Sequence, residues 1–290
     1  MPITDTALIF EGGGMRAAYS AGAVATLLEN GIDFSWVAGI SAGSSCTVNY
    51  VSRDAKRARD SFVDFMGDPR VGNWLTWFQG KGLFNAHFIY EETAGPGQVL
   101  PFDFASFQAN PAEIDISAFD CASGEAVHWH KADVPRLEDL MVRVRASSTM
   151  PVLMPPTTID GRVYVDGALG PSGGIALDAA KAAGFKRFFV VLTQPRAFVK
   201  HPIRGEKIYR WDFRKYPAVA DALAERHRNY NATKAELLDL EASGDACLFF
   251  PETMPVSNST TDVAELRAAY VLGLAQARSE LGKWKEFLGV

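Results

Sequence analysis

The chain has 290 residues, of which 48% are apolar and 22% are charged, proportions typical of a folded globular protein and unlike those of a disordered chain. Its 29 Lys and Arg residues against 34 Asp and Glu residues give a formal charge of −5, which argues against a dedicated nucleic-acid-binding protein, since such a protein would present a basic face. No stretch reaches the roughly 18 apolar residues needed to span a bilayer, and no secretory signal is visible. The sequence therefore predicts a cytoplasmic protein.

The first forty residues predict a βαβ unit. An apolar run at residues 7–10, bounded by glycines, is typical of a short buried strand. Alanines and leucines at helical spacing predict a helix over 15–29, which Asn30-Gly31 would end. A second apolar run at 34–40 predicts another strand. Strand, helix and strand in this order favour a parallel sheet.

Further along the chain, helical and strand patterns continue to alternate. Hairpins are predicted over 113–130 and 157–165, single strands over 188–192 and 247–250, and helices over 44–51, 54–65, 137–146, 175–183, 218–243 and 261–281. The Pro-rich stretch 150–156 predicts a rigid loop, and residues 193–217 an ordered loop or connector. We therefore expect an α/β core over residues 1–195, with a mostly parallel sheet, and a helical C-terminal extension over 196–290 packed on it.

A serine lies in a Gly-x-Ser-x-Gly pattern where a strand meets a helix. The segment is Gly39-Ile-Ser41-Ala42-Gly43. A sharp strand-to-helix turn needs small residues on both sides of the serine, and it presents the hydroxyl at a helix N-terminus. The pattern therefore predicts a nucleophile elbow. The alternative is a serine that merely caps the following helix.

A glycine cluster lies at the end of the first strand. Gly12, Gly13, Gly14 and Arg16 precede the first helix, where uncovered amides and the helix dipole favour an anion. The anion could be the oxyanion of acyl transfer. It could also be a dinucleotide phosphate, because Gly12 to Ala17 fits a loose dinucleotide-binding pattern with an acidic residue, Asp33, further on. A nucleotide-binding oxidoreductase is therefore the main alternative.

A carboxylate follows the second predicted hairpin. Asp166 is succeeded by Gly167 and Ala168, small residues that allow another segment to approach. An Asp-Gly pair is often only a turn. In a partly desolvated pocket, however, the pKa of an aspartate rises, and it can serve as the base for a serine.

Other polar and aromatic residues carry weaker signals. None of the histidines lies in a setting typical of a catalytic base, and we expect ordinary roles for His87, His128, His130, His201 and His227. The three widely spaced cysteines, Cys46, Cys121 and Cys247, form no disulfide or zinc pattern and predict buried reduced thiols. A third group predicts core packing or, alternatively, an acyl groove or interfacial lid: Trp74, Trp77, Phe78, Phe84, Met150 and Met154.

The glycine loop at 12–16, the serine motif at 39–43 and the aspartate motif at 166–168, in this order, resemble the patatin-like phospholipase family and in particular its bacterial members. The likeness spans residues 7–193 and includes Ala146-Ser-Ser-Thr-Met-Pro151. The tail is similar to one bacterial subgroup at 214–217 and 226–231. Two departures are Ala17, where the family usually has glycine, and the stretch 170–174, which differs from the family's Pro-containing pattern.

The resemblance implies a three-layer α/β/α sandwich and a Ser-Asp dyad without histidine. Ser41 would be the nucleophile, Asp166 its base, and the amides of the 12–14 loop the oxyanion hole, with Arg16 fixing that loop or adding positive charge. Family members cleave fatty-acyl esters of phospholipids, lysophospholipids or neutral lipids, without a metal or organic cofactor. The implied partner is the lipid substrate, with transient contact to a membrane surface. A catalytically silent lipid-binding protein is a further alternative, and the oligomeric state stays open.

Overall fold

A computed structural model describes residues 2–72, 82 and 84–290. Its centre is an eight-stranded sheet with the order β5-β6-β3-β2-β1-β7-β8, in which β4 pairs with β3 outside this path. The strands are β1 Thr6–Phe10, β2 Trp36–Ile40, β3 Glu113–Asp120, β4 Ala126–Trp129, β5 Thr157–Ile159, β6 Arg162–Asp166, β7 Arg187–Val191 and β8 Ala246–Phe249.

The middle of the sheet is parallel. β1 pairs in parallel with β2 and β7, and β3 and β8 extend the parallel part on either side, whereas β4, β5 and β6 are antiparallel. Phe10 of β1 lies opposite Gly39 of β2. Because parallel strands end at the same edge of a sheet, the segments after these two residues meet there. The sheet thus brings the glycine loop beside the serine motif.

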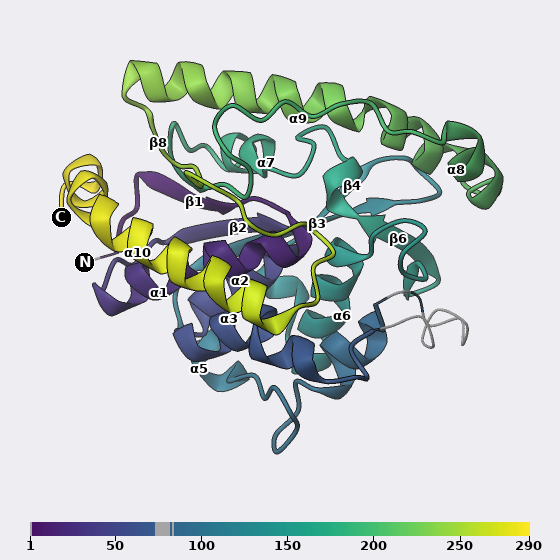
Figure 1. The fold of residues 1–290 in the computed structure, drawn as a ribbon, viewed down its shortest axis with the longest axis horizontal. Coiled ribbons are helices and arrows are strands. Elements are labelled where there is room, and N and C mark those ends of the chain that lie inside the picture. The colour runs from purple at the N-terminus through teal and green to yellow at the C-terminus, as the bar shows by residue number, and fades with distance from the viewer. Residues whose placement is uncertain (1, 73–81, 83) are drawn as a thin grey trace.

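Helices cover both faces of the sheet, which gives three layers (Figure 1). Leu8 and Phe10 of β1 pack into the core cluster with α1, α2, α6 and α10, while Ala7 and Ile9 pack on the other face with α7 and α9. Strands covered on both faces are apolar throughout, as the run at 7–10 is. The helices are α1 Ala17–Glu29, α2 Ala42–Val51, α3 Ala55–Phe62, α5 Phe104–Ala109, α6 Leu137–Ser148, α7 Leu177–Ala182, α8 Glu206–Asp212, α9 Pro217–Ser243 and α10 Val263–Leu288. The expected three-layer α/β/α sandwich with a mostly parallel sheet and a helical C-terminal extension is confirmed.

The C-terminal region contributes to the same core. β8 extends the sheet beside β7, and α10 lies along α1 with the two backbones in contact. Trp284 of α10 is fully buried, with its ring edge-on to Phe189 and Phe249 at 5.1 and 5.2 Å between centroids. The division of the chain into two parts near residue 195 stays a prediction. The position of β8 shows that residues after 195 complete the central sheet.

Most predicted elements are present, with shifted ends. The βαβ unit and both hairpins are confirmed. α2 begins at Ala42, directly after the serine, and α10 continues to Leu288. Two short helices, α5 and α8, were not predicted, because six or seven residues are too few to show a helical period. The segment 193–217, expected as a loop or connector, therefore contains a helix. No described helix is both long and apolar enough to cross a membrane.

Candidate active site

Ser41 occupies a strained turn between β2 and α2. Its φ of 57° and ψ of −129° lie in a region that residues with a side chain rarely adopt. A strand that enters a helix without a connecting loop requires this sharp reversal, which presents the serine side chain at the edge of the sheet. The elbow geometry expected from the sequence motif is therefore present.

The two glycines of the motif are required by close backbone contacts. A Cβ added to Gly39 would lie 2.2 Å from the carbonyl oxygen of Gly43, and a Cβ added to Gly43 would lie 2.2 Å from the carbonyl oxygen of Phe10. Either side chain would push α2 away from the strands. These close contacts explain why the motif has a glycine two residues before and two residues after Ser41.

The hydroxyl of Ser41 donates a hydrogen bond to Asp166. The distance from Ser41 Oγ to Asp166 Oδ2 is 2.7 Å, and both residues are almost completely buried. Asp166 ends β6, and its Oδ1 accepts a hydrogen bond of 2.8 Å from the amide of Ala168. The small pair Gly167 and Ala168 allows this turn, so each oxygen of the carboxylate has a fixed partner.

Burial raises the pKa of Asp166 above its usual value of 3.8. The positive charges of Arg226 and Lys200 and the two hydrogen-bond donors oppose this rise without cancelling it. A carboxylate with a raised pKa accepts a proton more readily than an exposed aspartate does. The site therefore holds a hydroxyl and a comparatively basic carboxylate in direct contact.

The glycine loop places two free amides in the same site. The amide of Gly12 is already bonded to the carbonyl of Gly174 at 3.0 Å, but those of Gly13 and Gly14 have no hydrogen-bond partner among the described residues. Gly14 has a φ of +56°, and a Cβ there would meet the carbonyl oxygen of Asn258 at 2.4 Å. Gly13 and Gly14 line a cavity together with Ser41 and Asp166.

A serine on α6 supports the elbow. Ser147 Oγ accepts a hydrogen bond of 2.9 Å from the amide of Ser41 and donates one of 2.7 Å to the carbonyl of Ser117. Two residues further on, the carbonyl oxygen of Thr149 accepts a hydrogen bond of 2.8 Å from the amide of Asp166. A role for Ser147 was not predicted from the sequence. The only signal for it was the position of Ala146–Pro151 within the family resemblance.

Two cavities meet at Ser41. The smaller, of about 60 Å³, is largely apolar, and the larger, of about 260 Å³, contains Asp166 and the cationic residues Arg16 and Arg226. The apolar cavity is also lined by Phe84, Met150 and Met154. For these three residues the sequence left open whether they pack in the core or line an acyl groove. This cavity is lined besides by Met15, Phe62, Phe65, Met66, Ile89 and Tyr90. Trp74, Trp77 and Phe78 lie outside the described residues.

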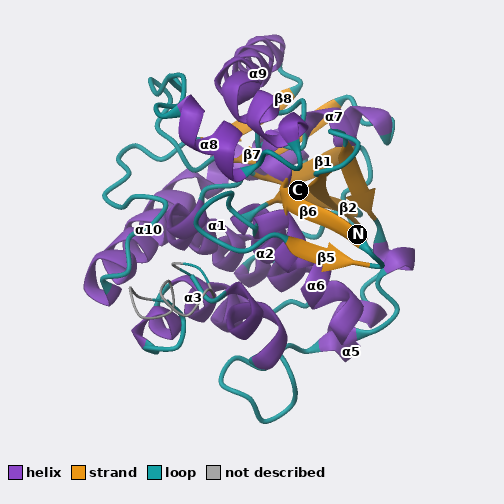
Figure 2. Cartoon of the chain, turned by 90° about the vertical axis from the view of Figure 1, so that its right-hand side faces the viewer, coloured by secondary structure: helices purple, strands orange, loops and turns teal. Residues whose placement is uncertain are grey.

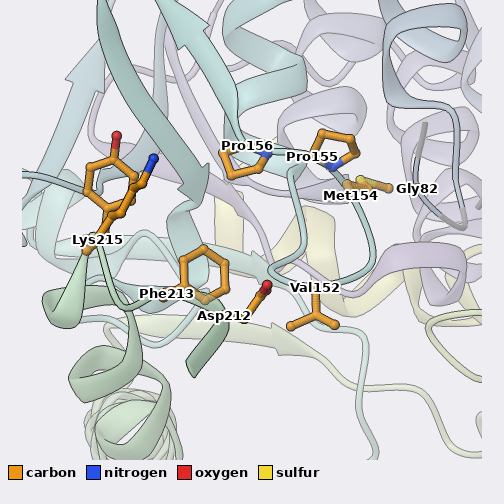
Figure 3. A pocket seen from close by; sticks show the side chains of 9 residues that line it. Gly82, Val152, Met154, Pro155, Pro156, Asp212, Phe213 and Lys215 are labelled. Atoms are coloured by element: carbon orange, nitrogen blue, oxygen red, sulfur yellow. The ribbon is translucent and has the colours of Figure 1, made fainter. Parts of the chain in front are cut away.

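The Pro-rich loop after α6 separates these cavities from a third. That cavity, of about 370 Å³, lies between the loop and the residues around the end of α8, where Phe213 and Asp212 face Val152 (Figure 3). Val152 also lines the larger active-site cavity, and Met154 the apolar one. A movement of this loop would therefore change all three cavities together.

The histidines lie elsewhere. Among the described residues that line the two cavities at Ser41 there is no histidine. His128 is bonded through Nδ1 to Asp115 at 3.0 Å, near Trp36 at the opposite end of β2. The described part of the chain has no group of three or more His, Cys, Asp or Glu placed to hold a metal. The three cysteines are buried and free, as expected.

The comparison with protein families decides the assignment. The model of the patatin-like phospholipases matches residues 8–177, more than half of the chain. The chain belongs to this family. Patatin-like phospholipases are lipid acyl hydrolases, so the protein is a lipid-hydrolysing enzyme in general terms.

Three further findings complete this result. Residues 216–289 match a domain of unknown function, DUF6363, which covers α9, β8 and α10. Among solved structures, VipD from Legionella pneumophila has a TM-score of 0.51 at 13% identity, over 96% of this chain and 67% of VipD. At this identity the likeness shows the fold alone. A search of curated proteins found no match.

Proposed function

We propose that this patatin-like protein is a serine hydrolase of fatty-acyl esters, of the phospholipase A, lysophospholipase or lipid esterase type. The observation that carries the proposal is the 2.7 Å hydrogen bond between Ser41 and Asp166, beside two amides that have no partner in the part of the chain that the structure describes. Nucleophile, base and oxyanion donors are the groups that acyl transfer requires.

The reaction would proceed in two steps. Asp166 takes the proton of Ser41 as its oxygen attacks the ester carbonyl, and the amides of Gly13 and Gly14 hold the resulting oxyanion. The intermediate collapses, the carbon–oxygen bond to the alcohol breaks, and the alcohol leaves with the proton from Asp166. Water then attacks the acyl-enzyme while Asp166 takes its proton, the bond to Ser41 breaks, and the proton returns to the serine.

The apolar cavity is the proposed place of the acyl chain. At about 60 Å³ it is smaller than typical ligand pockets of about 300–1,000 Å³, so it must widen to admit a fatty acid. Four of its lining residues are methionines, Met15, Met66, Met150 and Met154. Methionine side chains are unbranched and adapt to irregular shapes, which allows such widening.

We further propose peripheral contact with a membrane through the segment around α8. Val199, Ile203, Ile208 and Trp211 are exposed, and Ile208 and Trp211 are 65% and 69% exposed. Exposed basic side chains accompany them: Arg204, Lys207, Arg214 and Lys215. Aromatic and aliphatic side chains among cations suit an anionic lipid surface. Ile203 also lines the larger active-site cavity, so this surface adjoins the proposed substrate entrance. This would make the enzyme cytoplasmic with peripheral membrane binding.

Two alternative functions explain only part of these features. A nucleotide-binding oxidoreductase would use Gly12–Ala17, but it leaves Ser41 and its bond to Asp166 without a role. A catalytically silent lipid-binding protein would keep the cavities without an activated serine. Whether Ser41 is an activated nucleophile therefore distinguishes these functions.

Labelling with a fluorophosphonate probe, which reacts with activated serines, tests the proposal. We expect the wild type to be labelled and to hydrolyse a p-nitrophenyl ester. Ser41→Ala should lose both properties, and Asp166→Asn should lose hydrolysis by about 100-fold or more, because a positioned base contributes on that order. Ser243→Ala, an exposed serine outside the site, is the matched control. Labelling that persists in Ser41→Ala, or NAD(P) binding without any labelling, would contradict the proposal.

A further inference from the structure

A cation from the C-terminal region lines the cavity beside Ser41. Arg226 lies on α9, within the segment that matches the domain of unknown function. It borders the larger cavity together with Arg16, Ser41 and Asp166. Its charge is the strongest of those that lower the pKa of Asp166. A residue outside the 8–177 match is thus part of the site.

Neither arginine in this cavity has a partner in the described chain. The Nε atoms of Arg16 and Arg226 are sealed from solvent and have no hydrogen-bond partner, and neither guanidinium forms an ion pair there. A buried Nε–H group that forms no hydrogen bond costs free energy. A bound anion that supplies the missing acceptor is one explanation for such a group. Two of them in one cavity indicate a place for an anion.

The surrounding charges leave this cavity positive. Arg16, Lys200 and Arg226 influence one another, and the carboxyls that oppose them are Glu11 and Asp166. Glu11 is buried and accepts the amide of Thr193. Burial raises the pKa of both carboxyls and lowers that of Lys200 to about 8. Three cations thus face at most two negative charges.

We propose that Arg226 and Arg16 bind a phosphate group in the larger cavity, on the alcohol side of the ester. Guanidinium groups match phosphate oxygens with paired hydrogen bonds. The assignment to the alcohol side rests on the proposed function. With the acyl chain in the apolar cavity, the alcohol occupies the other cavity that meets Ser41. The phosphate could belong to a lipid headgroup or be a free phosphate ester.

Arg226 could instead act only on the charge of Asp166. In that case its removal would impair every substrate equally and move the pH profile upward, because Asp166 would lose a stabilising cation. Phosphate binding predicts a different result, a loss confined to substrates that carry the phosphate. The two roles are therefore separable by a pair of substrates with the same acyl chain.

The first test compares hydrolysis of a monoacylglycerol with that of its 3-phosphate by wild type, Arg226→Gln and Arg228→Gln. Arg228 lies on the same helix, but it is exposed and paired with Glu225, so it is the matched control for loss of one charge. We expect Arg226→Gln to lower kcat/KM for the phosphate substrate at least about 10-fold more than for the neutral one, through KM. Arg228→Gln should leave the ratio unchanged. An equal loss on both substrates would overturn the proposal.

The second test measures anion binding without catalysis. Glycerol 3-phosphate should raise the Tm of wild type and Arg228→Gln but not of Arg226→Gln. If inorganic phosphate acts equally well, the subsite recognises free phosphate as well as a headgroup. If glycerol 3-phosphate raises the Tm but the protein cleaves no ester, the phosphate subsite is supported and the proposed hydrolase function is contradicted. No shift with either anion in the wild type would overturn the subsite, even in an active hydrolase.

Discussion

Individual residues in this site are held in conformations and environments that favour reactivity over stability. Ser41 has a positive φ, Asp166 is a buried carboxyl with a raised pKa, and the amides of Gly13 and Gly14 lack partners among the described residues. Each of these features costs folding free energy, and the surrounding structure maintains them. Concentrated in one place, they are typical of a functional site.

The raised pKa of Asp166 predicts how activity and stability depend on pH. Asp166 accepts a proton only when ionised, so kcat/KM for a neutral ester should fall as the pH decreases through a midpoint above 3.8. Because the folded pKa exceeds the unfolded one, the contribution of Asp166 to stability is present below the unfolded pKa and lost as the pH rises through the folded value. The free energy of unfolding of Asp166→Asn, relative to that of wild type, should therefore increase from pH 4 to pH 7.

Urea unfolding of both proteins at the two pH values measures this change, and the pH–rate profile measures the midpoint. Ser243→Ala is again the control, because no titrating group of the site contacts it. A midpoint at or below 3.8, or a relative stability of Asp166→Asn that falls toward neutral pH, would contradict the assigned environment of this carboxyl.

Among the elements, the short and irregular ones arrange the surroundings of the dyad. α6 supplies Ser147 beneath the elbow, and the loop after it separates the cavities. α8 lies on the side of the molecule that also carries β5 and β6 (Figure 2). Phe213, at its end, is buried with Val219 and Leu223, which anchors the helix while Ile208 and Trp211 stay exposed. The helix is thus fixed in a position from which it can contact a lipid surface.

Replacing the exposed side chains of α8 should weaken membrane binding. We expect Ile208→Ala with Trp211→Ala to reduce the cosedimentation of the protein with anionic phosphatidylserine vesicles several-fold, because an interfacial tryptophan and its apolar neighbour are lost. The control is Val271→Ala with Leu272→Ala, which removes two exposed apolar side chains from α10. Equal loss in both double variants, or none in the first, would argue against this surface.

At the scale of the whole molecule, the C-terminal region is joined to the catalytic part by tight packing. α10 packs along α1, and Gly22 and Gly273 let the two backbones touch: a Cβ on Gly273 would lie 2.2 Å from the carbonyl oxygen of Tyr19. β8 continues the sheet, and α9 brings Arg226 to the cavity. The segment matched to the domain of unknown function is therefore part of the core and borders the site.

Two glycines of α10 should respond oppositely to the same substitution. Gly273→Ala should destabilise the protein by about 1–3 kcal/mol, because the added methyl group forces the helices apart. Gly282→Ala, where an added Cβ meets nothing within 4 Å, should stabilise it by about 0.5–1 kcal/mol through helix propensity. Denaturant unfolding measures both. Equal effects of the two substitutions would show that α10 does not pack closely on α1.

The sequence by itself determined the features whose causes are local. The strand at 7–10, the glycines around Ser41 and the hairpin over 157–165 follow from apolar runs and backbone sterics within a few residues, so their patterns predict them. The order of the three motifs indicated the family and, through it, the residues of the proposed dyad. The sheet register then explains why motifs so far apart in the chain meet. Gly39 of β2 lies opposite Phe10 of β1, and Ile40 and Asp166 lie opposite the neighbouring residues Ser117 and Ala118 of β3.

Only the tertiary structure decided what depends on contacts between distant segments. The amide of Gly12 is occupied by Gly174, Ser147 supports the elbow, and Arg226 reaches the cavity from α9. No local pattern marks these residues, because a serine or arginine in a helix looks the same whether it faces solvent or a buried cavity. Burial and partners are properties of the assembled fold, and they distinguish a reactive or binding side chain from an ordinary one.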